Sequence, residues 1–133
     1  MRRNKIAIIG SGFTGQGTAL FAAARDLGDI VLVDLPAREN YAKGVALDIM
    51  EAMPVYGSDT HLVGTADYEQ IRGADVVVIT AGVPRKPGMS REDLVNTNAT
   101  IVKDVAEKVA KYAPDSVIIV LTNPVDSMTY VAL

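Results

Sequence analysis

The chain has 133 residues, a length that suits one compact domain, with 49% hydrophobic and 22% charged residues. It has no cysteine and one histidine, which excludes disulfides, thiolate metal sites and cysteine nucleophiles. Because there is only one histidine as well, we expect no metal site. The formal net charge is −3 and there is no basic block, so we expect neither nucleic acid nor an anionic membrane as a partner.

The two ends of the chain lead to expectations about location and completeness. The apolar run at 6–9 follows basic residues but is too short for a signal peptide, and no stretch has the length of a transmembrane helix. We therefore expect a cytoplasmic protein. Residues 127–133 resemble the first turns of an apolar helix without a stop signal, so we expect the chain to be a fragment.

Short apolar runs recur along the chain and predict strands. They are rich in Val and Ile, show no alternation and are bounded by Gly or Asp, which is typical of parallel strands buried on both faces. The runs lie at 6–9, 30–33, 61–63 (the weakest), 76–79 and 117–121.

Helical spacing fills most of the gaps between these runs. We predict helices over 13–27 with Gly28 as C-cap, over 41–53 before Pro54, and over 91–112, with a short helix between the third and fourth strands. Ser90 and Asp93 predict a capping box at the start of the longest helix. The alternation predicts a doubly wound α/β fold with right-handed crossovers and strand order 3-2-1-4-5.

A glycine-rich loop joins the first strand to the first helix, where a G-x-G-x-x-G pattern can hold a pyrophosphate. Gly10 permits a tight turn, Gly12 lets phosphate approach the backbone, and Gly15 lets the helix close on the strand. The helix N-terminus offers free N–H groups to the phosphates. The predicted dinucleotide-binding residues of this loop are Gly10, Ser11, Gly12, Phe13, Thr14 and Gly15.

An acid ends the second strand. Asp34 follows Gly15 by about 20 residues, the position of a carboxylate that binds a ribose diol and repels a 2′-phosphate. This favours NAD over NADP. The nearby Arg38 would favour NADP, but we interpret it as a solvated loop residue. The alternative reading of the whole motif is an ordinary turn in which Asp34 caps a loop.

A basic loop follows the fourth strand. Residues 81–91 include Arg85, Lys86 and Arg91, and lie next to the point where the strand order reverses, which is where α/β folds bind ligands. Arginine suits a carboxylate or phosphate, so the loop indicates an anionic substrate, and Gly88 would allow it to close as a lid. A solvated loop is the open alternative.

The turn after the fifth strand carries an amide that can meet a cofactor or a substrate. Asn123 precedes Pro124, although Asn-Pro is also ordinary turn punctuation. Asn98, on the apolar face of the long helix, points either at the crevice or at local backbone. His61 begins the third strand at its amino end, away from the ligand edge, and we expect no catalytic role for it.

These motifs together resemble the lactate/malate dehydrogenase family, and within it the bacterial malate dehydrogenases of lactate-dehydrogenase-like type. The resemblance covers essentially the whole chain, and the arginine loop and the Thr-Asn-Pro turn are its most specific parts. The matching segments are 8–15, 31–34, 43–48, 79–91 and 121–126, with Asn98.

The resemblance implies a Rossmann domain over residues 1–133 with NAD as cofactor. It implies the loop at 10–15 on the pyrophosphate and Asp34 on the adenosine ribose. It also implies a cis bond before Pro124. The further cofactor residues that it implies are Gly82, Asn98, Leu121, Thr122 and Asn123.

For the substrate, the resemblance implies malate or oxaloacetate. Arg85 would bind the distal carboxylate, Arg91 would polarise the keto oxygen, and the Asn123 side chain would contact the substrate. Lactate-specific relatives carry a neutral residue at the position of Arg85, so a dicarboxylate is the better reading, with a lactate dehydrogenase as the alternative.

The resemblance also implies what the chain lacks. The family's proton-relay histidine, its aspartate partner, a third arginine and the sixth strand all lie beyond the Asn-Pro turn, and His61 does not match the catalytic position. We therefore expect this chain of 133 residues to bind NAD without full catalysis, either as half of a malate dehydrogenase or as a stand-alone binding module. Family members are usually dimers or tetramers, and the helix at 41–53 is the candidate interface.

Overall fold

The computed structural model describes residues 2–133 and contains one five-stranded parallel sheet in the order β3-β2-β1-β4-β5. This confirms the predicted strand order and fold class. The strands are β1 (Lys5–Ile9), β2 (Asp29–Val33), β3 (Leu62–Thr65), β4 (Val76–Ile79) and β5 (Val117–Val120).

The strand register brings the carboxyl ends of the strands to one edge. Ile9 pairs with Val33 on one side and with Ile79 on the other, and Ile79 in turn pairs with Val120. The strands β1, β2, β4 and β5 therefore all end at the same edge of the sheet. The order reverses between β1 and β4, so loops from both halves of the sheet meet there.

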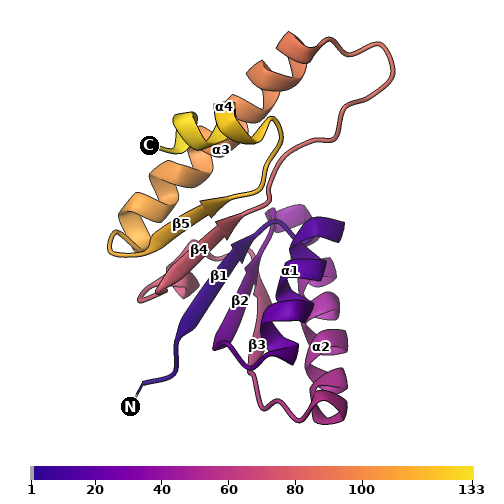
Figure 1. Cartoon of the computed structure of the whole chain (residues 1–133), viewed down its shortest axis with the longest axis vertical. Coiled ribbons are helices and arrows are strands. Elements are labelled where there is room, and N and C mark those ends of the chain that lie inside the picture. The colour runs from indigo at the N-terminus through magenta and orange to yellow at the C-terminus, as the bar shows by residue number, and fades with distance from the viewer. Residues whose placement is uncertain (1) are drawn as a thin grey trace.

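Helices cover the two faces of the sheet, as Figure 1 shows. One face packs against α1 and α2, and the other against α3 and the 3-10 helix η2 (Tyr68–Ile71), with α4 beside α3. A shorter 3-10 helix, η1 (Pro36–Arg38), precedes α2. The α-helices are α1 (Phe13–Ala24), α2 (Glu39–Tyr56), α3 (Arg91–Tyr112) and α4 (Val125–Ala132). Within residues 2–133, none of the helices is both long and apolar enough to span a membrane.

The longest helix has the predicted bounds, and its N-terminus has the predicted capping box. The Ser90 hydroxyl accepts a hydrogen bond from the Asp93 N–H at 3.0 Å, and the Asp93 carboxylate accepts one from the Ser90 N–H at 3.0 Å. Both bonds satisfy N–H groups that a helix start otherwise leaves unpaired. They fix the point at which the basic loop ends.

Two predicted helix ends were wrong. The first helix ends at Ala24 rather than at residue 27, and Gly28 is not its cap, because Asp26 already leaves the helix with a φ of 53°. The second helix runs past Pro54 to Tyr56, because Gly57, with a φ of 70°, supplies the left-handed cap further on.

The fifth strand is not buried on both faces as predicted. Val117 is 63% exposed and Ile119 is 45% exposed. Their register with Val76 and Val78 places both on the face that carries α1 and α2, but those helices pack over β1, β2 and β3. The apolar run thus predicted a strand correctly, while its burial depends on which helices reach it.

The third strand begins one residue later than predicted, at Leu62, and lies close to α2. A Cβ atom on Gly64 would overlap the backbone of Ala42 and Lys43 in α2. His61 lies just before this strand, exposed at the amino edge of the sheet, as predicted.

We expect Gly64→Ala to lower the free energy of unfolding by about 1–3 kcal/mol, since the added methyl must push two backbones apart. The matched control is Gly44→Ala in α2, where a Cβ meets no atom within 4 Å. Alanine there should stabilise the helix by about 0.5–1 kcal/mol. Urea unfolding measures both, and equal effects of the two substitutions would contradict the close packing of β3 on α2.

Candidate functional site

Three clefts run along the carboxyl edge of the sheet and the adjoining face of α3. The largest, about 760 Å³, lies between the sheet and α3, and we call it the Tyr68 cleft. The Asp34 cleft, about 390 Å³, lies over the glycine-rich loop and the end of β2. The Asn123 cleft, about 600 Å³, lies between that loop, the basic loop and the turn after β5.

Shared walls join the three clefts. The Tyr68 and Asp34 clefts have Gly10, Leu35 and Ile101 in common. The Asp34 and Asn123 clefts share Gly12 and Val83. The three clefts therefore adjoin one another across the point where the strand order reverses, with the glycine-rich loop at the centre, and we call them together the channel.

The glycine-rich loop lies tightly against the ends of β1 and β4. Gly10 has a φ of 108°, and a Cβ there would lie 2.7 Å from the Thr80 hydroxyl oxygen. A Cβ on Gly15 would overlap the carbonyl oxygen of Gly10. The Thr80 hydroxyl donates a hydrogen bond to the carbonyl oxygen of Ile9 at 3.0 Å. Two of the three glycines are thus required by the protein's own packing.

The third glycine is different, because nothing in the protein needs it. A Cβ on Gly12 would meet no atom within 4 Å, and its backbone φ of −70° suits any residue. Gly12 is the N-cap of α1, where no side chain caps the helix and the first turn holds no acid. The first N–H groups of α1 are therefore available to an anion in the channel, and Gly12 leaves it room.

Asp34 lies at the end of β2 and accepts several hydrogen bonds. The donors are the Ser11 N–H at 3.1 Å, the Ser11 hydroxyl, the Leu35 N–H at 2.7 Å and the Arg38 guanidinium at 3.1 Å. Burial alone would raise the pKa of this carboxyl, but the hydrogen bonds outweigh it and hold the pKa below its ordinary value. Asp34 is therefore a fixed carboxylate in the channel wall.

Arg38 is exposed, in line with its interpretation as a solvated residue, but it also pairs with Asp34. Its Nε lies 3.1 Å from the Asp34 carboxylate, its guanidinium carbon lies 4.5 Å from the centre of the Tyr41 ring, and it lines the Asp34 cleft. The sequence did not predict this contact, because it depends on the 3-10 helix η1, which turns Arg38 back toward the end of β2. A polar loop pattern carries no information on that turn.

Asn98 connects the two loops that form the Asn123 cleft. Its side-chain oxygen accepts from the Val83 N–H at 2.8 Å, and its Nδ2 donates to the carbonyls of Val83 at 3.2 Å and Asn123 at 2.7 Å. The residue is 1% exposed. Of the two alternatives for Asn98, the backbone one is therefore present, although Asn98 also lines the cleft.

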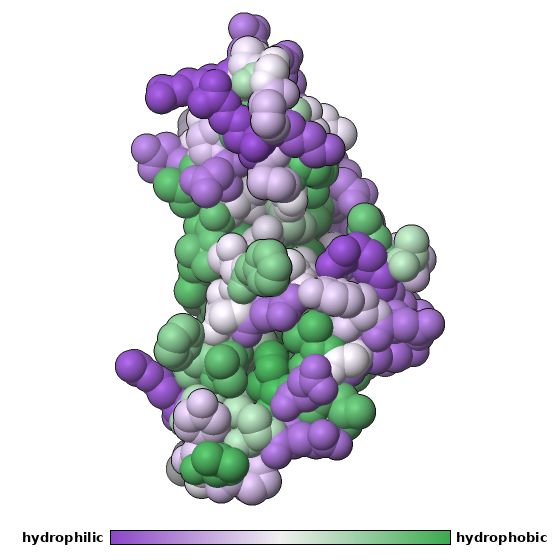
Figure 2. Space-filling model, turned by 90° about the vertical axis from the view of Figure 1, so that its right-hand side faces the viewer, coloured by the Kyte–Doolittle hydropathy of each residue, from purple (hydrophilic) through white to green (hydrophobic). Residues whose placement is uncertain are grey.

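The predicted substrate residues are only partly brought together. Arg85 and Asn123 both line the Asn123 cleft, where Gly82, Leu121 and Thr122 also lie. Arg91 is exposed at the start of α3 and does not line any of the three clefts described above. In Figure 2 hydrophilic residues dominate the upper end of the molecule, where the basic loop at 81–91 lies.

The peptide bond between Asn123 and Pro124 is cis, as the resemblance implies. It follows Thr122, whose hydroxyl donates to the carbonyl of Ala81 at 2.7 Å. The turn after β5 is thereby tied to the loop after β4.

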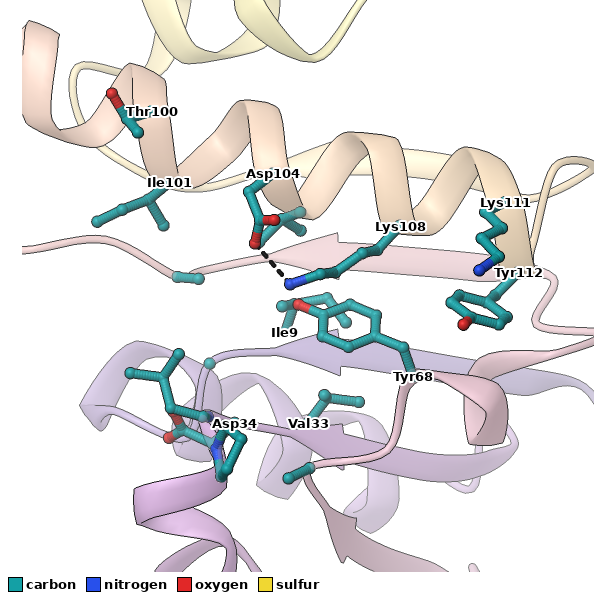
Figure 3. Close-up of a pocket in the computed structure, with 16 residues that line it drawn as sticks. Ile9, Val33, Asp34, Tyr68, Thr100, Ile101, Asp104, Lys108, Lys111 and Tyr112 are labelled. Carbon is teal, nitrogen blue, oxygen red and sulfur yellow. Dashed lines mark hydrogen bonds and ion pairs between the residues drawn. The ribbon is translucent and has the colours of Figure 1, made fainter.

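The sequence reasoning missed the Tyr68 cleft. Figure 3 shows the Tyr68 ring close to Lys108 and Ile9, with Lys108 paired to Asp104. Burial, with the charges of Asp104 and Asp34 adding to it, raises the pKa of the Tyr68 hydroxyl. Tyr68 lies in a four-residue 3-10 helix, too short for any periodic signal.

Among residues 2–133 no group of three His, Cys, Asp or Glu side chains is placed to hold a metal ion. His61 lies at the opposite edge of the sheet from the three clefts and lines a separate hollow with Arg2, Arg3 and Lys5.

Comparison with protein families and sequences gives a consistent result. The family of the lactate/malate dehydrogenase NAD-binding domain matches residues 4–133. The chain is 92% identical to a malate dehydrogenase of Symbiobacterium thermophilum over 100% of this chain and 42% of that protein. It is 57% identical to a malate dehydrogenase of Bacillus subtilis over 96% of this chain and 41% of that protein. The chain thus spans about two fifths of the length of these relatives.

Solved structures agree with the sequence matches. The apo malate dehydrogenase of Picrophilus torridus superposes with a TM-score of 0.92 at 44% identity, covering 98% of this chain and 41% of that one. The malate dehydrogenase of Archaeoglobus fulgidus in complex with NADH gives a TM-score of 0.90 at 41% identity, covering 96% and 43%. The fold, the glycine-rich loop and these matches together show that the chain belongs to the lactate/malate dehydrogenase family, as its NAD-binding domain.

Proposed function

We propose that this domain serves a malate dehydrogenase, which interconverts malate and oxaloacetate by hydride transfer. The observation that carries the proposal is the set of adjoining clefts, in which Asp34 provides a carboxylate suited to a ribose and the basic loop provides Arg85. NAD accepts or supplies the hydride when it is bound. The residues of this chain bind it, orient it and place the substrate beside it.

The fit of the channel to NAD rests on three features of the chain. Gly12 leaves open space at the uncapped start of α1, where the loop at 10–15 would hold the pyrophosphate. Asp34 would accept hydrogen bonds from the adenosine ribose, and its carboxylate disfavours a 2′-phosphate. The residues proposed for the nicotinamide side are Gly82, Asn98, Leu121, Thr122 and Asn123, all of which line the Asn123 cleft.

The substrate would bind at the cationic end of the channel. Arg85 would hold the distal carboxylate, and the amide of Asn123, which lines the same cleft, would also bind the substrate. Arg91 would stabilise charge on the keto oxygen. Since Arg91 lies outside the clefts at the start of α3, this role requires its long side chain to turn toward the substrate.

Hydride transfer to a carbonyl also needs a proton, and the Asn123 cleft provides no donor for it. No histidine or carboxylate lines that cleft, and the one histidine of the chain, His61, lies at the opposite sheet edge. We propose that residues outside these 133 handle the proton. The second candidate is a stand-alone NAD-binding module, which the same lack of a proton donor favours.

An oxaloacetate/NADH assay on this chain should show no turnover. Measurable turnover would contradict the proposal that residues outside these 133 handle the proton.

The proposal extends to assembly and location. We propose a homo-oligomer in which α2 forms an interface, because its Tyr41 and Leu47 side chains are about half exposed. A cytoplasmic location fits a protein that acts on NAD and small dicarboxylates. Light scattering and cell fractionation would check the two statements.

We expect Gly12→Ala to weaken NAD binding by about tenfold and to lower stability by less than about 1 kcal/mol, because the methyl group occupies space that only the ligand needs and alanine is a poorer N-cap than glycine. The matched control is Gly17→Ala in the same helix, where a Cβ also meets nothing within 4 Å. Calorimetric titration with NAD and thermal unfolding measure the two effects. Equal affinities of the two variants would count against the placement of the pyrophosphate.

NAD affinity should be constant from about pH 5 to 8 as far as Asp34 is concerned, because its pKa is lowered from an ordinary value of 3.8. The carboxylate form is therefore present throughout, and its contribution is lost only at a pH below the ordinary carboxyl value of 3.8. Titrations at several pH values test this. A loss of affinity between pH 8 and 5 that Asp34→Asn abolishes would overturn it.

In the complete enzyme, Arg85→Gln should lower kcat/KM for oxaloacetate relative to pyruvate by about tenfold or more, because a charged pair with the second carboxylate is lost. Lys86→Gln is the control, since it removes the neighbouring exposed charge, which does not line the cleft. Steady-state kinetics with both substrates measure the preference, and an unchanged ratio in Arg85→Gln would exclude the proposed role.

A further inference from the structure

The tip of the basic loop is a tight turn. The Met89 N–H donates to the carbonyl of Lys86 at 3.1 Å, and Gly88 has a φ of 83°. A hydrogen bond from the fourth residue to the first, with proline second and glycine third, is the pattern of a type II turn, and Pro87 is the second residue here. The third residue of such a turn needs a positive φ. A Cβ on Gly88 would meet no atom within 4 Å, so the backbone angle, and not the space, requires glycine.

The turn brings the chain back to Arg85. The Nε–H of Arg85 donates to the carbonyl of Met89 at 3.2 Å. That carbonyl belongs to the same peptide unit as the Ser90 N–H, which donates to the Asp93 carboxylate at 3.0 Å in the capping box of α3. One peptide unit is thus fixed to the start of α3 by its N–H and holds Arg85 by its oxygen. We call residues 85–89, closed by the turn and by the Arg85–Met89 hydrogen bond, the Arg85 clip.

The clip uses only Nε of the Arg85 guanidinium. The two terminal nitrogens make no hydrogen bond or ion pair with another group among residues 2–133, and they carry four of the five N–H donors of an arginine. Side by side, they can bind a carboxylate through two parallel hydrogen bonds. Arg85 lines the Asn123 cleft. A long side chain that is already held at Nε loses less rotamer freedom when it binds a ligand there.

We propose that Gly88 is a positioning residue that determines substrate specificity: its left-handed backbone lets the Met89–Ser90 peptide hold Arg85, which preorganises the terminal guanidinium nitrogens for the second carboxylate of a dicarboxylate. The inference rests on the proposed role of Arg85 with malate or oxaloacetate. A residue at 88 that disfavours positive φ opens the turn and releases Arg85 from Met89. A monocarboxylate substrate offers no second carboxylate to Arg85 and gains nothing from the clip.

Two other roles for Gly88 make different predictions. A glycine that only gives the loop freedom to close would serve every substrate, because closure excludes water from all of them. A glycine needed for space would be replaced worst by the largest side chain. The clip depends on φ instead, and asparagine adopts a positive φ more readily than alanine although its side chain is larger. Gly88→Asn should therefore resemble the wild type more closely than Gly88→Ala does.

The first measurement uses this chain, isotopically labelled for NMR. Exchange of the Arg85 Nε–H with water is followed, and its signal is assigned through its loss in Arg85→Gln. We expect exchange in the wild type and in Gly88→Asn to be slower than in Gly88→Ala by about threefold or more, since a hydrogen-bonded proton exchanges only when the bond opens. Equal exchange in the wild type and Gly88→Ala would overturn the proposal.

The second measurement is the steady-state kinetics of the complete enzyme with oxaloacetate and pyruvate. Gly88→Ala should raise KM for oxaloacetate by about fivefold with little change in kcat, because the second carboxylate is held equally in the ground and transition states. For pyruvate, kcat/KM should change by less than about twofold. The matched control is Gly73→Ala, which has the same backbone strain at a φ of 72° and the same open space, but lies outside the three clefts.

Circular dichroism and thermal unfolding check that each variant keeps the fold. Equal losses for the two substrates in Gly88→Ala, or equal effects of Gly88→Asn and Gly88→Ala, would overturn the proposal. An unchanged substrate ratio in Arg85→Gln would instead contradict the proposed function. A changed ratio in Arg85→Gln without one in Gly88→Ala would overturn the role of the clip alone.

Discussion

The site depends on one close approach, that of the start of α1 to the ends of β1 and β4. It is possible only because Gly15 has no side chain where the carbonyl of Gly10 lies and because Gly10 adopts a positive φ. This contact places the helix N-terminus directly above the point where the strand order reverses. The clefts, the position of Asp34 beside Ser11 and the approach of the basic loop all follow from it.

The elements and their order could be predicted from the sequence because buried parallel strands and capped helices have strong local signals. The run 76–79 and the Ser90–Asp93 capping box are examples, and both are present as predicted. Two of the failures arise from contacts between distant segments. The exposure of Val117 depends on which helices cover a face, and the burial of Tyr68 depends on α3, which begins more than 20 residues later.

The candidate site shows the same division. Motif spacing predicted that the loop at 10–15, Asp34, Arg85 and Asn123 would line one channel, because parallel strands bring their carboxyl ends together. Motif spacing did not predict the hydrogen bonds that position these groups. The Ser11 hydroxyl on Asp34 and the Asn98 amide between two loops are supports that become visible only when the side chains are placed.

The Asn98 amide and the capping box together set the limits of movement in the basic loop. Val83 is anchored to Asn98 through both of its backbone groups, and Ser90 is anchored to α3. The segment between the two anchors, 84–89, can therefore swing only as a short strap with both ends fixed. Arg85 sits close to one anchor, so its reach changes little during such a swing. Gly88, with a φ of 83°, lies near the other end, where the absence of a side chain permits the widest range of backbone angles.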